Sequence, residues 1–169
     1  QECRASWERE GKRFSYDELE RLAGEAGPCE CCFDPNAEDF SLAGNMPEKI
    51  REYYRRRGQK EPETVGQIVR CIYESLALKY CEELEKLEKG SGRKIKKIQI
   101  LGGGAKSEML CQLTADRCGR EVTAGPVEAT ALGNLMVQLM ALGEIRDSVT
   151  ARKVLRRSIE FCRYIPKKM

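Results

Sequence analysis

Histidine is absent from this 169-residue sequence. Its absence excludes Ser-His-Asp and Cys-His catalysis, histidine-ligated metals and histidine acid–base chemistry within the chain. Long apolar runs are missing as well, so neither a membrane span of about 18 residues nor a signal peptide is predicted. A strong net charge is also lacking, because 30 lysines and arginines face 27 aspartates and glutamates, a balance of +3. We therefore expect neither nucleic acid nor a membrane surface as a partner.

The composition that remains suits a globular domain. Apolar residues make up 41% of the chain, close to the globular average, and a chain of this length can bury a core without disulfides. The first residue is Gln1 rather than methionine, and it lies inside an expected helix. We therefore expect residues 1–169 to form a single partial domain of a longer protein.

Nine cysteines are present, an odd number that cannot all pair within one chain. This number, in a chain too large for a disulfide-stapled scaffold, favours reduced thiols and a cytoplasmic location. Cys29, Cys31 and Cys32 form a cluster in the sequence. A zinc site would need further ligands, and no second cysteine pair has the usual spacing of two to four residues. The sequence favours thiols without a metal, but it leaves metal binding at these three residues open.

Capping residues and apolar periodicity predict most of the elements. In the first half, we expect a surface loop at 27–45 and helices over 2–10, 15–24, 45–58 and about 65–88. In the second half, we expect strands at 94–101 and 122–124 and helices at 105–118, 128–142 and 149–158. Two strands joined by a helix form a βαβ unit, so the predicted fold class is α/β with a helix-rich first half. Because two strands make a poor sheet, we expect further strands from outside the chain.

The segment with a chemical signature is 98–107, in which an apolar strand is followed by Gly102, Gly103 and Gly104 and then by the start of a helix. Glycines let a ligand approach the backbone, and a helix N-terminus favours anions. Neither the Walker A nor the Rossmann pattern fits. From the pattern alone, a tight turn without a ligand is as good an interpretation as a nucleotide site.

Three stretches, 102–110, 112–116 and 124–134, together resemble the C-terminal domain of FGGY carbohydrate kinases. The third stretch, Ala-Gly-Pro-Val-Glu-Ala-Thr-Ala-Leu-Gly-Asn, carries most of the specificity. Residues 33–36 and 69–80 fit the same subgroup, the members that phosphorylate L-rhamnulose. The likeness extends over residues 28–145.

The resemblance implies part of an actin-like, ribonuclease-H-like ATPase domain and transfer of the ATP γ-phosphoryl group, with Mg²⁺, to a ketose such as L-rhamnulose. It assigns nucleotide contact to Gly102, Gly103, Gly104 and Ser107, with Gly103 in the position credited with touching ATP. Relatives often carry Asn where Ser107 stands. The family's general base, its Mg²⁺-binding carboxylate and most of its sugar contacts have no counterpart here. We therefore expect no catalytic residue in this chain and no kinase activity from it alone.

Three alternatives stay open at the level of the sequence. The first is a kinase of the same family for xylulose, glycerol or fuculose, although residues 125–129 favour rhamnulose. The second is an actin-like ATP-binding module without phosphotransfer. The third is a zinc-bearing interaction domain built on residues 29–32. In each case an exposed sheet edge would invite self-association of the chain.

Overall fold

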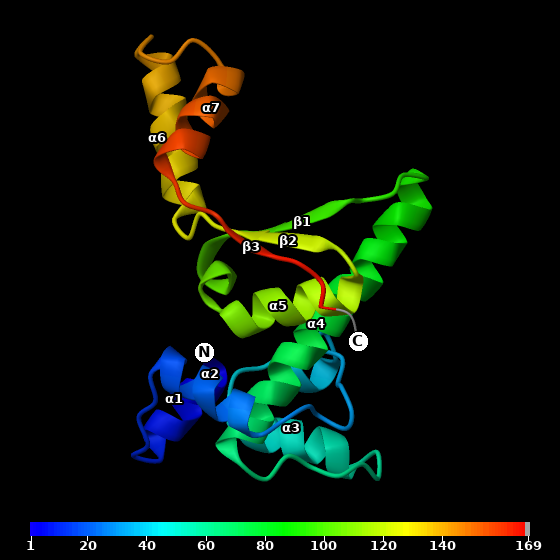
Figure 1. Ribbon diagram of the computed structural model, residues 1–169. Helices are drawn as coiled ribbons and strands as arrows, with labels where there is room; N and C mark the ends of the chain where they lie inside the picture. The colour runs from blue at the N-terminus through cyan, green and yellow to red at the C-terminus, as the bar shows by residue number, and fades with distance from the viewer. Residues whose placement is uncertain (168–169) are drawn as a thin grey trace. The chain divides into compact units, whose positions relative to one another are not determined.

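A computed structural model describes residues 1–167 of the chain (Figure 1). The residues divide into two compact units, one over Gln1–Leu87 and one from Glu88 onward. The predicted α/β class is confirmed, since helices and a small sheet are both present. Within the described residues, every helix is either too short or too polar to cross a bilayer.

The first unit is helical. Its elements are α1 (Glu2–Arg9), α2 (Tyr16–Glu25), the 3₁₀ turn η1 (Glu38–Phe40), α3 (Met46–Arg55) and most of α4 (Val65–Ser91). As the sequence predicts, Ser15, Asn45 and Thr64 each accept a hydrogen bond from the backbone N–H three residues further on. These bonds satisfy donors that the start of a helix otherwise leaves unpaired. The capping residues therefore fix where α2, α3 and α4 begin.

An aromatic cluster forms the core beside the segment that joins α2 to α3. Phe33 lies 5.0 Å from Phe40 and 6.0 Å from Tyr53, measured between ring centroids. Only 7% of Phe33 is exposed. The segment 27–45 was expected as a surface loop, and its backbone is indeed largely irregular. It differs from that expectation in being anchored to the core by one buried aromatic side chain.

The second unit contains a three-stranded sheet. Its elements are β1 (Lys97–Ile100), η2 (Gly102–Lys106), α5 (Glu108–Cys118), β2 (Glu121–Ala124), α6 (Ala129–Ala141), α7 (Ser148–Ser158) and β3 (Cys162–Tyr164). Strand β2 is central, parallel to β1 and antiparallel to β3. The predicted βαβ unit is confirmed, whereas β3 was not predicted. Its three residues, Cys162, Arg163 and Tyr164, alternate apolar and polar side chains, but so short a run does not by itself predict a strand, and only the pairing with β2 reveals it.

Helix α5 packs along the sheet (Figure 1). Cys111 and Ala115 of α5 are fully buried against Val122 and Ala124 of β2. Ile98 and Ile100 of β1 pack against the same cluster. Alternate strand residues point to one face of a sheet, so the period-two pattern of these apolar residues creates the surface that α5 covers.

Helices α6 and α7 pack against each other through Met136, Ile145 and Ala151. The sequence predicts burial of Leu132, Met136 and Leu139 on α6, and only Met136 is fully buried. Leu135 and Val137 are 47% and 59% exposed. This helix is therefore more apolar than its contacts among the described residues require.

Candidate nucleotide site

Two segments that carry the sequence signature meet at one edge of the sheet. The backbone N–H of Gly102 donates to the carbonyl of Pro126 at 3.1 Å, and that of Gly125 donates to the carbonyl of Ile100 at 2.9 Å. These bonds hold the glycine turn after β1 beside the turn after β2. Both turns follow the carboxyl ends of parallel strands, which is where α/β sheets usually bind ligands.

The three glycines of the turn differ in backbone conformation, packing and exposure. Gly102 has φ +71°, a conformation that residues with a Cβ rarely adopt. A Cβ on Gly104 would stand 3.3 Å from Cγ2 of Ile100, so this position is closed by packing. A Cβ on Gly103 would meet no described atom within 4 Å, and the residue is exposed. The backbone at Gly103 is thus the part of the turn that is open to an incoming ligand.

Ser107 begins α5. Its hydroxyl oxygen accepts a hydrogen bond from the backbone N–H of Leu110 at 3.1 Å, which makes Ser107 the N-cap. The helix was expected from residue 105, but residues 102–106 form the 3₁₀ turn η2 instead. A structural role therefore accounts for this hydroxyl group, and its expected contact with nucleotide stays a prediction.

The charged groups near the turn are few. Lys106 is exposed at the end of η2, next to the N-terminus of α5, where the helix dipole is positive. Asp116, the carboxylate on α5, accepts hydrogen bonds from Gln112 Nε2 at 2.8 Å and from the backbone N–H of Lys167 at 2.7 Å. These contacts tie Asp116 to the chain segment after β3, so its role is structural. The helix dipole and Lys106 favour an anion at the turn, whereas Glu108, exposed in the first turn of α5, opposes one.

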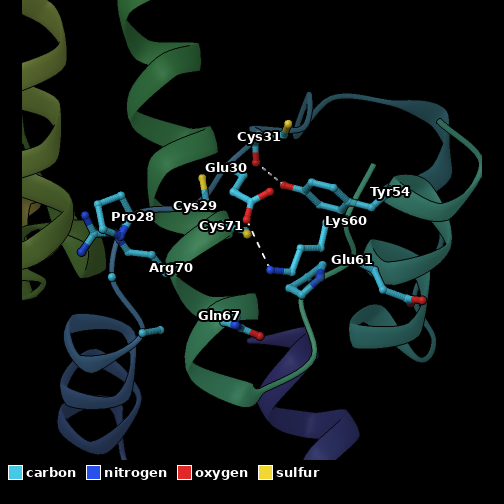
Figure 2. A pocket seen from close by; sticks show the side chains of 13 residues that line it. Pro28, Cys29, Glu30, Cys31, Tyr54, Lys60, Glu61, Gln67, Arg70 and Cys71 are labelled. Atoms are coloured by element: carbon cyan, nitrogen blue, oxygen red, sulfur yellow. Dashed lines mark hydrogen bonds and ion pairs between the residues drawn. The ribbon is translucent and has the colours of Figure 1, made fainter. Parts of the chain in front are cut away.

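The cysteine cluster of the first unit is divided in space. Cys29 Sγ and Cys32 Sγ are 3.8 Å apart, whereas the sulfur of Cys31 points away from those of Cys29 and Cys71 (Figure 2). Two α4 residues join the first pair: the Cys71 thiol interacts with the Cys29 thiol, and Glu74 Oε2 lies 3.3 Å from Cys29 Sγ. Cys71 and Glu74 were not predicted as neighbours of this loop. Their spacing of three residues on a helix was the only available signal.

Hydrogen bonding within this cluster shifts the pKa values of the thiols. Bonds to Cys32 and Cys71, together with burial, raise the pKa of the Cys29 thiol. The bond from Cys29 lowers the pKa of Cys71. Burial raises the pKa of Tyr54, whose hydroxyl donates to the carbonyl of Cys31 at 2.5 Å. A cavity of about 70 Å³ lies beside these residues (Figure 2).

Comparison with known proteins points to one family. Residues 1–142 match the model of the C-terminal domain of the FGGY family of carbohydrate kinases. The chain is 42% identical to a rhamnulokinase of Bacteroides thetaiotaomicron over 99% of its own length, and 43% identical to one of Enterococcus faecalis over 86%. It covers 34% and 30% of these two relatives. The chain thus spans about a third of the length of the curated relatives that it matches.

A solved structure supports the fold. The chain is similar to a xylulose kinase from Rhodospirillum rubrum with a TM-score of 0.53 and 19% sequence identity, over 90% of this chain and 30% of that one. At this identity the likeness concerns the fold alone. It agrees with the actin-like ATPase architecture expected from the sequence.

Proposed function

Because this chain belongs to the FGGY family of carbohydrate kinases, we propose that it is the nucleotide-binding part of an ATP-dependent sugar kinase whose substrate is L-rhamnulose. The observation that carries the proposal is the open backbone of Gly103, set between the carboxyl ends of two parallel strands. The family match supports the reaction class, and this geometry supports the proposal that the nucleotide lies on the turn. We further propose that residues 1–169 are a partial domain of the kinase.

In this proposal, ATP lies on the glycine turn, and each residue of the turn has its own part in holding it. Gly102 gives the backbone its left-handed conformation, Gly104 packs against Ile100, and Gly103 leaves room for a ligand to lie directly on the backbone. Near the N-terminus of α5, the dipole and Lys106 attract the phosphate groups. Bound ATP supplies the phosphoryl group, and Mg²⁺ neutralises its charge. In this proposal, Ser107 adds a hydroxyl contact on the nucleotide side.

Catalysis would use groups outside this chain. We place the general base, the Mg²⁺-binding carboxylate and most of the sugar contacts in the part of the enzyme that this chain does not include. The chain itself binds and orients the nucleotide. Consistent with this division, Asp116 is engaged in structural hydrogen bonds and does not act as the base.

L-rhamnulose is favoured over other acceptors because the two relatives compared above are both rhamnulokinases and match most of the chain. A kinase for xylulose, glycerol or fuculose, or an ATP-binding module without phosphotransfer, has weaker support. The kinase would work in the cytoplasm, in keeping with nine cysteines that are all free thiols. Self-association through an exposed edge of the sheet stays a prediction.

A coupled assay of the full-length kinase that contains this chain tests the substrate. ADP formation is measured with L-rhamnulose, xylulose, glycerol and L-fuculose as acceptors. We expect the highest kcat/KM with L-rhamnulose. A higher value with another acceptor would reassign the substrate within the family, and turnover of none would favour the non-catalytic module.

A further inference from the structure

Four side chains from two distant parts of the sequence gather around one point in the first unit. Cys29 and Cys32 lie three residues apart on the loop after α2, and Cys71 and Glu74 lie three residues apart on α4. The Sγ atoms of Cys29 and Cys32 and a carboxylate oxygen of Glu74 all lie within 4.8 Å of one another. Residues three apart on a helix lie on the same side of it, so Cys71 and Glu74 both face the loop from α4.

We propose that Cys29, Cys32 and Glu74 bind one zinc ion, which fastens the loop to α4. The two sulfurs are separated by 3.8 Å, and Cys29 Sγ is 3.3 Å from Glu74 Oε2. Tetrahedral zinc with Zn–S of about 2.3 Å and Zn–O of about 2.0 Å places sulfurs about 3.8 Å apart and sulfur and oxygen about 3.5 Å apart. Two of the three distances between ligand atoms therefore match tetrahedral zinc, and the third, from Cys32 Sγ to the Glu74 carboxylate, lies within 4.8 Å.

The surroundings hold Glu74 in the orientation of a ligand. Its Oε1 accepts from Arg70 Nε at 2.5 Å and from the backbone N–H of Cys29 at 3.3 Å, which leaves Oε2 facing the sulfurs. The side chains of Arg70 and Glu74 are only 16% and 9% exposed. Ligand carboxylates in metal sites are commonly held in this way by hydrogen bonds from outside the ligand set.

The charges balance when zinc is bound. Cys29 and Cys32 each lose a proton to solvent, so two thiolates and one carboxylate surround Zn²⁺, and the guanidinium of Arg70 offsets the remaining negative charge. Only three ligands come from this group. A fourth ligand would have to come from solvent or from a neighbouring side chain such as Cys71, whose thiol interacts with that of Cys29.

Sequence inspection alone could not find this ligand set. The sequence contains no second cysteine pair at zinc spacing, because the third ligand is a glutamate on α4, 45 positions from Cys29. Cys31, which the sequence grouped with its neighbours, has its sulfur directed away from Cys29 (Figure 2). Its backbone carbonyl accepts from Tyr54 instead, which fixes the loop between the two ligand cysteines.

Cobalt substitution tests the site on the 169-residue chain, prepared reduced and free of metal. We expect one equivalent of Co²⁺ to give thiolate charge-transfer absorption and the intense visible bands of a tetrahedral site, both abolished by one equivalent of Zn²⁺. Cys32→Ser and Glu74→Gln should each weaken Co²⁺ binding at least tenfold. The matched control Cys31→Ser changes the neighbouring thiol and should leave the spectrum and the affinity unchanged.

Thiol alkylation of the unsubstituted chain gives a readout that does not depend on a variant folding. Zn²⁺ should protect Cys29 and Cys32 from iodoacetamide, while the exposed Cys162 continues to react. Three results would overturn the proposal: no thiolate bands with Co²⁺, equal loss of binding in Cys31→Ser, or no protection of Cys29 and Cys32 by Zn²⁺. None of these results bears on the kinase activity, so the two proposals fail separately.

Discussion

The carbonyl group of Leu22 on α2 lies directly against the Cα of Gly66 on α4. A Cβ placed on Gly66 would overlap the carbonyl oxygen of Leu22 and stand 2.8 Å from its carbonyl carbon. Both atoms belong to the backbone, so neither can move without shifting a helix. Gly66 is therefore required for the close packing of these two helices.

Gly66→Ala should destabilise the chain by about 1–3 kcal/mol, because the added methyl group forces α2 and α4 apart. Urea unfolding followed by circular dichroism measures the change. Gly90→Ala is the matched control: it lies in the same helix, and its Cβ would meet no described atom within 4 Å. The control should be neutral or should gain up to about 1 kcal/mol from helix propensity. Equal stability of the two variants would contradict the packing described here.

Phe33→Ala should cost about 3–5 kcal/mol, since it removes the buried ring that anchors the segment 27–45 to the aromatic cluster. Leu42→Ala changes the same segment at a side chain that is 74% exposed, and it should stay within about 0.5 kcal/mol of the unsubstituted chain. Thermal and urea unfolding of both variants test this difference. A small effect at Phe33 would mean that the segment is not held by its aromatic residue.

Glu88 should make the second unit sensitive to acid. Its carboxylate accepts hydrogen bonds from Lys94 Nζ at 2.9 Å and from the backbone N–H of Ile95 at 2.8 Å. These bonds, the one to Lys94 above all, lower the pKa of Glu88 to about 2. Because the pKa of Glu88 is lowered in the folded state, its ionised carboxylate stabilises the fold at pH values above the ordinary pKa near 4.5. This stabilisation is lost as the pH falls toward 2.

Glu88→Gln should therefore melt at a lower temperature than the unsubstituted chain at pH 7, and the difference should shrink steadily between about pH 4.5 and pH 2. Glu85→Gln serves as control, because Glu85 lies on the same helix and is exposed. Melting curves at half-unit pH steps provide the measurement. If the difference in melting temperature between Glu88→Gln and the unsubstituted chain were the same at pH 7 and pH 2, the lowered pKa of Glu88 would be contradicted.

Nucleotide binding should be separable from phosphotransfer. The 169-residue chain alone should bind ATP through the turn at Gly103 but form no ADP with L-rhamnulose, because we place the general base elsewhere. Calorimetry measures binding, and a coupled assay measures turnover. ADP formation that depends on L-rhamnulose would show that the chain carries its own base.

The sequence predicts those features that depend on neighbouring residues. Ser15 with Glu18 marks the start of α2, and the strand–glycine–helix pattern around Gly103 marks the candidate site, because capping and turn chemistry act over a few residues. Strand β3 and the burial of Phe33 were not predicted. Both depend on partners far away in the chain, and the local sequence at either place carries little signal of its own.

The three residues proposed as zinc ligands illustrate the same limit. Cys29 and Cys32 are visible in the sequence as a pair, but Glu74 lies 45 positions from Cys29 and only the fold brings them together. Likewise, the three glycines of the turn look equivalent in the sequence. Only the structure separates Gly104, which packs against Ile100, from Gly103, which is open.

The KM for ATP of the full-length kinase with Gly103→Val tests most directly whether this turn holds the nucleotide. The Cβ at this position has room in the chain, so folding and the KM for L-rhamnulose should stay close to those of the unsubstituted enzyme. The KM for ATP should rise at least tenfold, whereas Gly90→Val should leave it unchanged. An unaltered KM for ATP in a folded Gly103→Val enzyme would contradict the central claim.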